Sequence, residues 1–273
     1  MDHRDVGRYW NANAEAWTKL SRAGYDVYRD LVNTPAFFDS LPSIDGLRVL
    51  DLGCGEGHNT RLLADRGAEV TGADIAEEFI AHARNAEIQE PRGITFEVAS
   101  AVELPFADRA FDAVTSFMAL MDVPEIERAL AEVHRVLEPG GFFQFSISHP
   151  CFDMPNRRSV KDERGKRIGV VVGDYFNRGQ GFVEEWLFSA APPDATAGLL
   201  PFKTPRFVHT LSEWINMLVA AGFTIEHCVE PYVADAVIAK YPRAARWRVV
   251  PDAIHFRVRR PDAPSFVRVV TPR

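Results

Sequence analysis

The chain has 273 residues, of which 31 are Lys or Arg and 38 are Asp or Glu, so its formal net charge at pH 7 is −7. A chain of this length can bury a full core without disulfides or metals, as one large α/β domain or as a domain with an insertion. The acidic balance argues against a nucleic acid or an anionic membrane as a partner, because both favour a basic surface.

The cysteines and the N-terminal residues bear on the compartment. Cys54, Cys151 and Cys228 show no CxxC or Cys/His metal spacing, and an odd number fits a disulfide framework poorly. The first residues, MDHRDVGRYW, carry acids where a signal peptide needs a basic and then an apolar region, and no run approaches the ~18 apolar residues of a membrane span. We therefore expect a cytoplasmic protein with no metal site and no membrane partner, and the sequence leaves a homodimer open.

Between residues 47 and 148, apolar runs rich in β-formers alternate with segments of helical period. Strands are predicted over 47–52, 68–74, 94–99, 111–117 and 142–148, and helices over 59–66, from about 77, and over 124–137. This alternation is typical of a parallel sheet with helices on both faces. It predicts a Rossmann-like, doubly wound α/β fold.

The residue pattern of the chain changes after residue 148. Residues 149–209 lack a helical period and hold short β-like runs between Gly and Pro turns, which predicts a β-rich insertion with one or two hairpins. From residue 210 a helix capped by Thr210 or Ser212 and two further strands, 223–230 and 253–259, complete a mostly parallel, seven-stranded sheet. The predicted division is therefore 1–45 (N-terminal helical lid), 46–148 (core), 149–209 (insertion) and 210–273 (completion of the core).

The loop after the first strand, in VLDLGCGEGHNT, decides the ligand class. A dinucleotide fingerprint, G-x-G-x-x-G, would need glycine where His58 stands, and no Lys-Ser or Lys-Thr follows to make a phosphate-binding P-loop. The pattern is instead D-x-G-x-G-x-G, with Asp51 before Gly53, Gly55 and Gly57. An acid at the mouth of this loop would repel phosphate and receive an ammonium group, so the loop favours a cationic ligand without phosphate.

Three segments occur in the order and spacing of a known family: VLDLGCGEG, ELPFADRAFDAV and ALAEVHRVLEPGGFF. With them the chain resembles the class I S-adenosylmethionine-dependent methyltransferases of the small-molecule type. The resemblance is strong over 48–148, weaker around TLSEWINMLVAAGF, and slight in the insertion. It implies S-adenosylmethionine as cofactor, bound by the core segment 46–148, with the insertion supplying the acceptor pocket.

The resemblance also implies the residues that hold the methionine and ribose parts of the cofactor. It places Gly53, Cys54 and Gly55 against the methionine half, with Asp51 near its amino group. Asp74, at the end of the second predicted strand, is implied to accept both ribose hydroxyls. A carboxylate suits this role because each of its two oxygens can take an O–H donor.

The remaining cofactor contacts implied by the resemblance follow later strands. Ile75 follows the ribose-binding acid, and Ser100 stands where the family commonly has an acid for the adenine amino group. The hydroxyl of Ser100 can still accept that hydrogen bond, and the backbone of Ala101 can serve the ring nitrogen. Phe117 and Met118 are implied to line the methyl-donor side, with simple core packing as the alternative.

The N-terminal segment RYWNANAEAW resembles the lid helix of small-molecule members. This resemblance implies that Tyr9 or Trp10 closes over the cofactor. An amphipathic helix that merely packs on the sheet is the alternative.

Methyl transfer from a sulfonium is an in-line displacement, so alignment and exclusion of water are the main tasks of the enzyme. A general base helps where the acceptor is a hydroxyl or a protonated amine. His149 is the first candidate because it ends the fifth predicted strand at the ligand-binding edge; a turn residue held by Pro150 is the alternative. Asp122, Tyr175 and the pair Glu184 and Glu185 are weaker candidates.

The insertion is rich in aromatic residues, which can stack a planar acceptor, surround a cationic amine, or form a small core of their own. These residues are Phe152, Tyr175, Phe176, Phe182, Trp186 and Phe188.

The leading hypothesis is methyl transfer to a small-molecule acceptor with an N- or O-nucleophile. A methyltransferase acting on RNA or protein is the main alternative, but SFMALMDV holds no Asn-Pro-Pro-Tyr-like loop for positioning an amide. Two further alternatives are a non-catalytic cofactor-binding protein and a nicotinamide oxidoreductase, and the missing glycine at position 58 disfavours the oxidoreductase.

Overall fold

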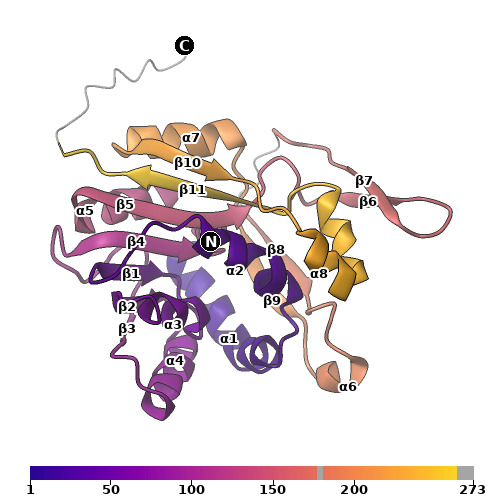
Figure 1. Ribbon diagram of the computed structural model, residues 1–273, viewed down its shortest axis with the longest axis horizontal. Helices are drawn as coiled ribbons and strands as arrows, with labels where there is room; N and C mark the ends of the chain where they lie inside the picture. Colours follow the sequence, from indigo (N-terminus) through magenta and orange to yellow (C-terminus); the bar gives the residue numbers. More distant parts are fainter. Residues whose placement is uncertain (177–180, 263–273) are drawn as a thin grey trace.

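The computed structural model describes residues 1–176 and 181–262, and one seven-stranded sheet forms its centre (Figure 1). The strand order is β10-β11-β5-β4-β1-β2-β3, and β11 is the one strand of this sheet that runs opposite to the other six. The predicted doubly wound, mostly parallel fold is therefore confirmed. The strands are β1 (Arg48–Leu52), β2 (Glu69–Asp74), β3 (Thr95–Val98), β4 (Phe111–Phe117), β5 (Leu137–Ser148), β10 (Thr224–Val229) and β11 (Ala253–Arg259).

Helices cover both faces of the sheet because successive side chains of a buried strand point to opposite sides. In β1, Val49 packs into one core, whereas Leu50 and Leu52 pack into the other. The first core is closed by α2 (Thr34–Asp39), α3 (His58–Ala64) and α4 (Glu77–Gln89), and the second by α5 (Ile126–Val136) and α7 (Leu211–Ala220).

The predicted N-terminal segment is helical. Helix α1 (His3–Arg22) begins at a capping box between Asp2 and Asp5, and it packs between α4 and β9 (Phe202–Arg206). A short π-helix, η1 (Arg29–Asn33), continues directly into α2. Such a π-helical turn inside a helical run is frequent at functional sites.

The insertion forms two small antiparallel pairs, as its β-like runs predict. The hairpin of β6 (Arg158–Lys161) and β7 (Arg167–Val171) projects from the body, and β8 (Phe182–Trp186) pairs with β9 beside α1 (Figure 1). The short helix α6 (Pro193–Thr196) lies in the connection between β8 and β9. The division of the chain into four segments stays a prediction, and its last residues, 263–273, lie outside the described residues.

Two details differ from the sequence prediction. Strand β5 begins at Leu137, five residues before the predicted start at 142, so Pro139-Gly140-Gly141 lie inside the strand, with Gly140 at φ +80°. The connection between β10 and β11 holds α8 (Asp235–Lys240) and the 3-10 helix η3 (Pro242–Arg248), which were not predicted. Both are short, so neither shows the extended periodicity that identifies a helix in a sequence.

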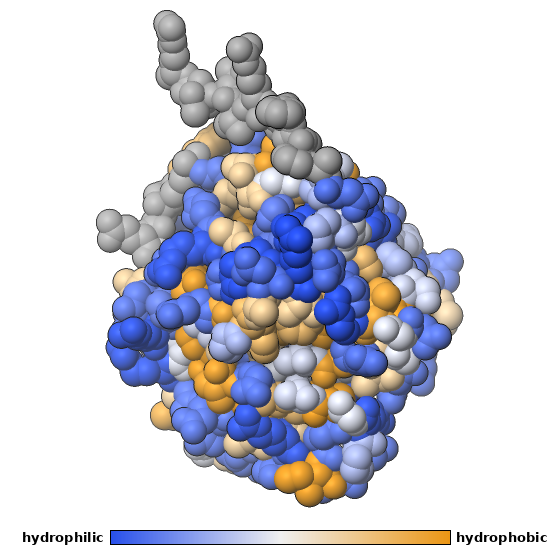
Figure 2. Space-filling view, turned by 90° about the vertical axis from the view of Figure 1, so that its left-hand side faces the viewer, coloured by the Kyte–Doolittle hydropathy of each residue, from blue (hydrophilic) through white to orange (hydrophobic). Residues whose placement is uncertain are grey.

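The surface shown in Figure 2 is mostly hydrophilic, with hydrophobic residues in separate groups. Within residues 1–176 and 181–262, no helix combines the length and hydropathy that crossing a bilayer requires.

The capping box of α7 gives a test of local stability. The Thr210 hydroxyl accepts a hydrogen bond from the Glu213 backbone N–H at 3.2 Å, and the Glu213 carboxylate accepts one from the Thr210 N–H at 2.8 Å. We expect Thr210→Ala to lower the free energy of unfolding by about 1 kcal/mol in urea titrations. Asn216→Ala, on an exposed position of the same helix, is the matched control and should change it by less than about 0.5 kcal/mol. Equal effects of the two changes would contradict the capping role.

Candidate active site

A cavity of about 610 Å³ lies where the parallel strands end. Its walls come from the loops after β1, β2, β3 and β4, from α1 and η1, and from the insertion strands β8 and β9. Ligands of open α/β sheets bind at this edge, and the volume is within the range of about 300–1,000 Å³ typical of small-molecule sites.

The loop after β1 is held against the end of β2. The backbone N–H groups of Gly53 and Cys54 both donate to the Ala73 carbonyl, at 2.7 and 3.1 Å. Gly53 adopts φ +71°, and a Cβ there would lie 2.4 Å from the Cβ of Ala119. Only glycine fits, because both the backbone conformation and the space exclude a side chain. The loop therefore presents bare backbone to the cavity.

Asp74 ends β2, and its carboxylate is fixed by the same loop. One oxygen accepts from the Gly55 N–H at 2.9 Å and the other from the Ala76 N–H at 2.8 Å. Burial raises the pKa of Asp74, and the backbone donors of Ala76 and Gly55 oppose that shift. Each oxygen keeps lone-pair capacity toward the cavity that Asp74 lines.

Asp51 also lines the cavity, but its carboxyl is more deeply buried than the predicted position at the mouth of the loop implied. Its two oxygens accept from the hydroxyls of Thr60 at 2.7 Å and Thr115 at 2.9 Å. Burial raises its pKa to about 6, the two hydroxyls lower it, and the nearby Asp74 raises it further. A cation in the cavity would favour the charged form of both carboxyls.

The other predicted cofactor contacts lie along the same wall. Ile75, Ser100, Ala101, Phe117 and Met118 all line the cavity. Met118 has φ +55°, and its N–H donates to the Ser146 carbonyl at 2.8 Å. A left-handed methionine is uncommon, and this strained turn directs the chain from β4 along the cavity.

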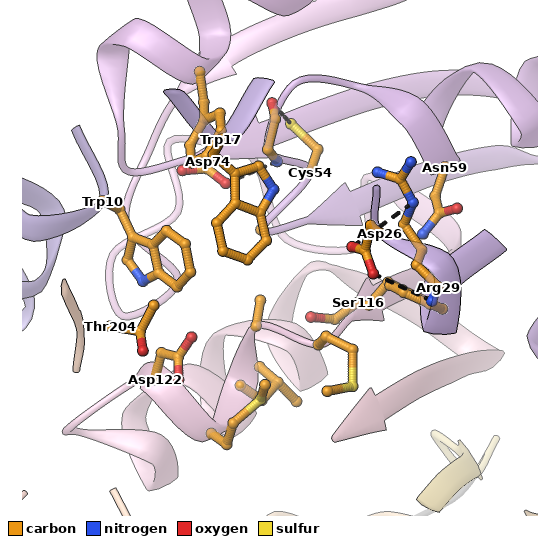
Figure 3. A pocket seen from close by; sticks show the side chains of 18 of the residues that line it. Trp10, Trp17, Asp26, Arg29, Cys54, Asn59, Asp74, Ser116, Asp122 and Thr204 are labelled. Atoms are coloured by element: carbon orange, nitrogen blue, oxygen red, sulfur yellow. Dashed lines mark hydrogen bonds and ion pairs between the residues drawn. The ribbon is translucent and has the colours of Figure 1, made fainter. Parts of the chain in front are cut away.

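Aromatic side chains form the wall opposite the sheet (Figure 3). Trp10 and Trp17 of α1 meet edge to face with ring centroids 5.3 Å apart, and Trp17 meets Trp186 and Phe188 at 5.2 and 5.0 Å. The Trp186 indole N–H donates to the Thr204 hydroxyl at 3.0 Å, which fixes its ring. The predicted contact of the N-terminal helix with the cavity therefore falls on Trp10, and Tyr9 is not among the lining residues.

A group of charged side chains lies beside this aromatic wall. Asp122, at the end of the 3-10 helix η2 (Leu120–Asp122), lines the cavity and is 5% exposed. Arg206 of β9 lies 3.7 Å from Asp122, binds Asp153, and lies 3.7 Å from Glu184. Burial raises the pKa of Asp122 to about 8; Arg206 lowers it, and Glu184 and Asp153 raise it.

Asp26 and Arg29 line the cavity toward the other side of the view in Figure 3. Arg29 donates to the Ser21 hydroxyl at 2.6 Å and lies 3.6 Å from the Glu56 carboxylate. Arg22 also binds Glu56, at 2.9 Å, so the end of α1 and η1 are both joined to the glycine loop.

Four of the five predicted catalytic candidates, His149, Tyr175, Glu184 and Glu185, are not among the residues that line the cavity. His149 is 2% exposed; its Nδ1 accepts from the Cys151 N–H at 3.1 Å, so its Nε2 donates to Glu230 at 2.8 Å. The Tyr175 oxygen accepts from the Leu211 N–H at 2.9 Å, at the start of α7. Glu185 faces solvent on β8 and lies 3.5 Å from Lys203. Of the five, Asp122 is the one that the structure places in the described wall of the cavity.

Several lining residues were missed in the sequence. Trp17 stands seven positions after Trp10, a spacing that places both on one helix face and could have identified it. Of the insertion aromatics, Trp186 and Phe188 line the cavity, whereas Phe152 packs on His149. Arg206 had no such signal, because its place depends on the pairing of β9 with β8.

Comparisons with known proteins bear on the family. A family model described as a methyltransferase domain matches residues 50–145. The crystal structure of an S-adenosylmethionine-dependent methyltransferase from Mesorhizobium loti is similar to this chain, with 32% identity and a TM-score of 0.68, over 83% of this chain and 96% of that one.

Two curated relatives match over shorter stretches. A fatty-acid O-methyltransferase of Mycolicibacterium smegmatis is 37% identical over 122 residues, 44% of each chain. A demethylmenaquinone methyltransferase of Thermus thermophilus is 44% identical over 96 residues, 34% of this chain and 44% of that protein. This chain thus spans less than half the length of these two relatives.

The match over nearly the whole M. loti chain, with the fold and the glycine loop described above, settles the family. The chain belongs to the S-adenosylmethionine-dependent methyltransferases. It is a transferase enzyme whose cofactor is S-adenosylmethionine.

Asp122 should make stability depend on pH. The folded-state pKa of Asp122, about 8, lies above the ordinary value of about 3.9. The stabilisation of the folded state by the protonated carboxyl is therefore fully present below about pH 4 and is lost as the pH rises to about 8. Relative to Asp122→Asn, which stays neutral, the free energy of unfolding of the wild type should fall by ~2–5 kcal/mol between these limits. Urea unfolding at both pH values measures this difference, and a difference independent of pH would contradict it.

Proposed function

We propose that the enzyme transfers the methyl group of S-adenosylmethionine to a small-molecule acceptor with an N- or O-nucleophile. The observation that carries this proposal is one cavity that joins the glycine loop and Asp74 to an aromatic wall from α1, β8 and the loop after β8. With the cofactor in place, the space left beside that wall suits a small molecule.

The proposed cofactor site uses backbone and carboxylates. The backbone of Gly53, Cys54 and Gly55 allows the methionine half to approach closely, because the two glycines carry no side chain, and Asp51 adds negative charge for its ammonium group. The free lone pairs of Asp74 suit the two ribose hydroxyls, because both its oxygens are already oriented by backbone donors. The acids in the cavity fit a cofactor that carries a positive sulfonium.

Ile75, Ser100 and Ala101 are proposed to surround the adenine, and Phe117 and Met118 the methyl-donor side. The Ser100 hydroxyl accepts a long hydrogen bond from the Val102 N–H, at 3.4 Å, so it keeps lone-pair capacity to accept from an adenine amino group. We assign the lid role to α1 through Trp10 and Trp17, because both lie on the cavity wall.

Two further observations support a small molecule as the acceptor. The names of the two curated relatives specify a fatty acid and demethylmenaquinone, and both are small molecules, much smaller than an RNA or a protein. The net charge of −7 disfavours an RNA substrate. In such a site, catalysis consists of aligning the nucleophile with the methyl group and excluding water.

Among the predicted general bases, the geometry favours Asp122. His149 has both ring nitrogens hydrogen-bonded and lies outside the cavity wall, which supports a structural role at the end of β5. Tyr175 and Glu185 likewise lie outside the wall.

The ribose assignment predicts a loss of cofactor affinity in Asp74→Asn. Replacing the carboxylate weakens charge-assisted hydrogen bonds worth about 1.5–3 kcal/mol each, so S-adenosylhomocysteine should bind about 10–100-fold more weakly in calorimetry. Asp108→Asn, an exposed carboxyl-to-amide change paired with Arg135, is the control and should leave affinity unchanged. Wild-type affinity in Asp74→Asn would overturn the assignment.

The function itself is tested with radiolabelled S-adenosylmethionine. The enzyme is incubated with amines, phenols and carboxylates, and separately with small-molecule, RNA and protein fractions of a cell extract. We expect label in the small-molecule fraction, and label confined to RNA or protein would contradict the proposal. In parallel, S-adenosylhomocysteine but not NADH should raise the melting temperature.

A further inference from the structure

The charged group beside the aromatic wall has an excess of acids. Asp122, Asp153 and Glu184 surround a single guanidinium, that of Arg206. Arg206 and Asp122 both line the cavity, and Asp153 is the partner that Arg206 binds directly, at 2.5 Å. Asp153 also lies 3.7 Å from the guanidinium of Arg157, but among the described residues Arg206 is the one cation paired with Asp122 and Glu184. This part of the cavity therefore has room for a second positive charge.

Asp122 is the acid that lacks a partner. Its Oδ1 is buried and has no hydrogen-bond partner among the described residues, and the Arg206 guanidinium nitrogen is 3.7 Å away, beyond a good hydrogen bond. A buried polar atom without a partner costs about 1–3 kcal/mol, and a donor from a ligand in the cavity would remove that cost.

The aromatic side chains that line the same cavity favour the same ligand. Trp10, Trp17 and Trp186 line the same cavity as Asp122, and Figure 3 shows Trp10, Thr204 and Asp122 on one side of the view. The Trp186 indole N–H donates to Thr204, which stands two residues before Arg206 on β9. Indole rings attract cations, most strongly where water is excluded. An acid without a partner beside several indoles is therefore suited to an ammonium group. A carboxylate acceptor would instead meet the buried Asp122, and the guanidinium of Arg206 beside it is already paired with Asp153.

Asp122 also lies close to where the methyl group must be. Ala119, three residues before it, touches the position that a Gly53 side chain would occupy in the cofactor loop. The Met121 carbonyl accepts from the Phe207 N–H at 2.9 Å, which fixes η2 against the end of β9. The backbone thus links the cofactor loop and Asp122 over one short turn.

We propose that the methyl acceptor is an amine, bound as an ammonium ion between the indoles and Asp122, and that Asp122 takes its proton. This inference rests on the proposed small-molecule methyl transfer. One N–H proton passes from the ammonium to the Asp122 carboxylate, and the freed nitrogen lone pair attacks the methyl carbon. The N–C bond forms as the C–S bond breaks, and its electron pair stays on sulfur. The products are an N-methylammonium, S-adenosylhomocysteine and protonated Asp122.

Calorimetry on the protein saturated with S-adenosylhomocysteine tests the binding step with three probes of one scaffold: 2-phenylethylammonium, 2-phenylethanol and 3-phenylpropanoate. The ammonium should bind at least about tenfold more tightly than the alcohol or the carboxylate. Asp122→Asn should abolish this preference with no change in S-adenosylhomocysteine affinity, and Asp108→Asn should keep it. Absence of a preference for the cation, including absence of binding by all three probes, overturns the inference.

Transfer is tested with radiolabelled S-adenosylmethionine and a small-molecule cell extract, with and without prior acetylation of its amines. Acetylation should abolish most of the labelling, and labelling that survives it overturns the amine assignment. Absence of label in both extracts contradicts the proposed function instead, so the two failures are distinguishable.

The proton-transfer role has its own readout. With an amine that is labelled, Asp122→Asn should lower the rate at pH 7 about 10²–10⁴-fold, as expected for loss of a general base. The deficit should shrink as the pH approaches the pKa of the amine itself, because the free amine then needs no base. A deficit that is constant with pH indicates a structural effect and overturns the proton-transfer role.

Discussion

The close approach of Gly53 to Ala119 is the contact on which the arrangement of the site depends. A side chain at Gly53 would lie 2.4 Å from the Ala119 Cβ, so the loop after β1 can reach this position only as bare backbone. Once there, the loop donates two N–H groups to Ala73 and one to Asp74, which joins β1 to the end of β2. The same contact brings the cofactor loop against the turn that carries Met118 and Asp122, so donor and acceptor sides share one wall.

Three acids on this wall, Asp51, Asp74 and Asp122, are buried in a cavity that holds few cations, and burial raises the pKa of each. The described residues compensate these charges only partly, through hydroxyls, backbone N–H groups and the Arg206 guanidinium, which lies 3.7 Å from Asp122. A positive ligand supplies the missing charge, and S-adenosylmethionine is such a ligand by virtue of its sulfonium. The site is thus less stable empty than loaded, which couples cofactor binding to the stability of the fold.

The order of strands and helices in the core could be predicted from the sequence, because each of these elements carries its own local signal. Leu47 to Leu52 is mostly apolar, Thr210 begins a capping box, and Gly53 to Gly57 mark a sharp turn. The acceptor side could not be predicted in this way, since it depends on pairing between segments far apart in the chain. Arg206 meets Asp122 only because β9 returns along β8 and against η2.

From the sequence, His149 ranks above Asp122 as the general base, because position in the chain does not show which hydrogen-bond partners a side chain meets in the fold. His149 ends β5 at the ligand-binding edge, but Glu230 from the end of β10 and the turn at Cys151 occupy both of its ring nitrogens. Asp122 has the opposite character, since it is buried, lines the cavity and has an oxygen without a partner. A carboxyl in that state lowers the stability of the folded protein at neutral pH, and its retention in a stable core is most simply explained by a ligand that needs it.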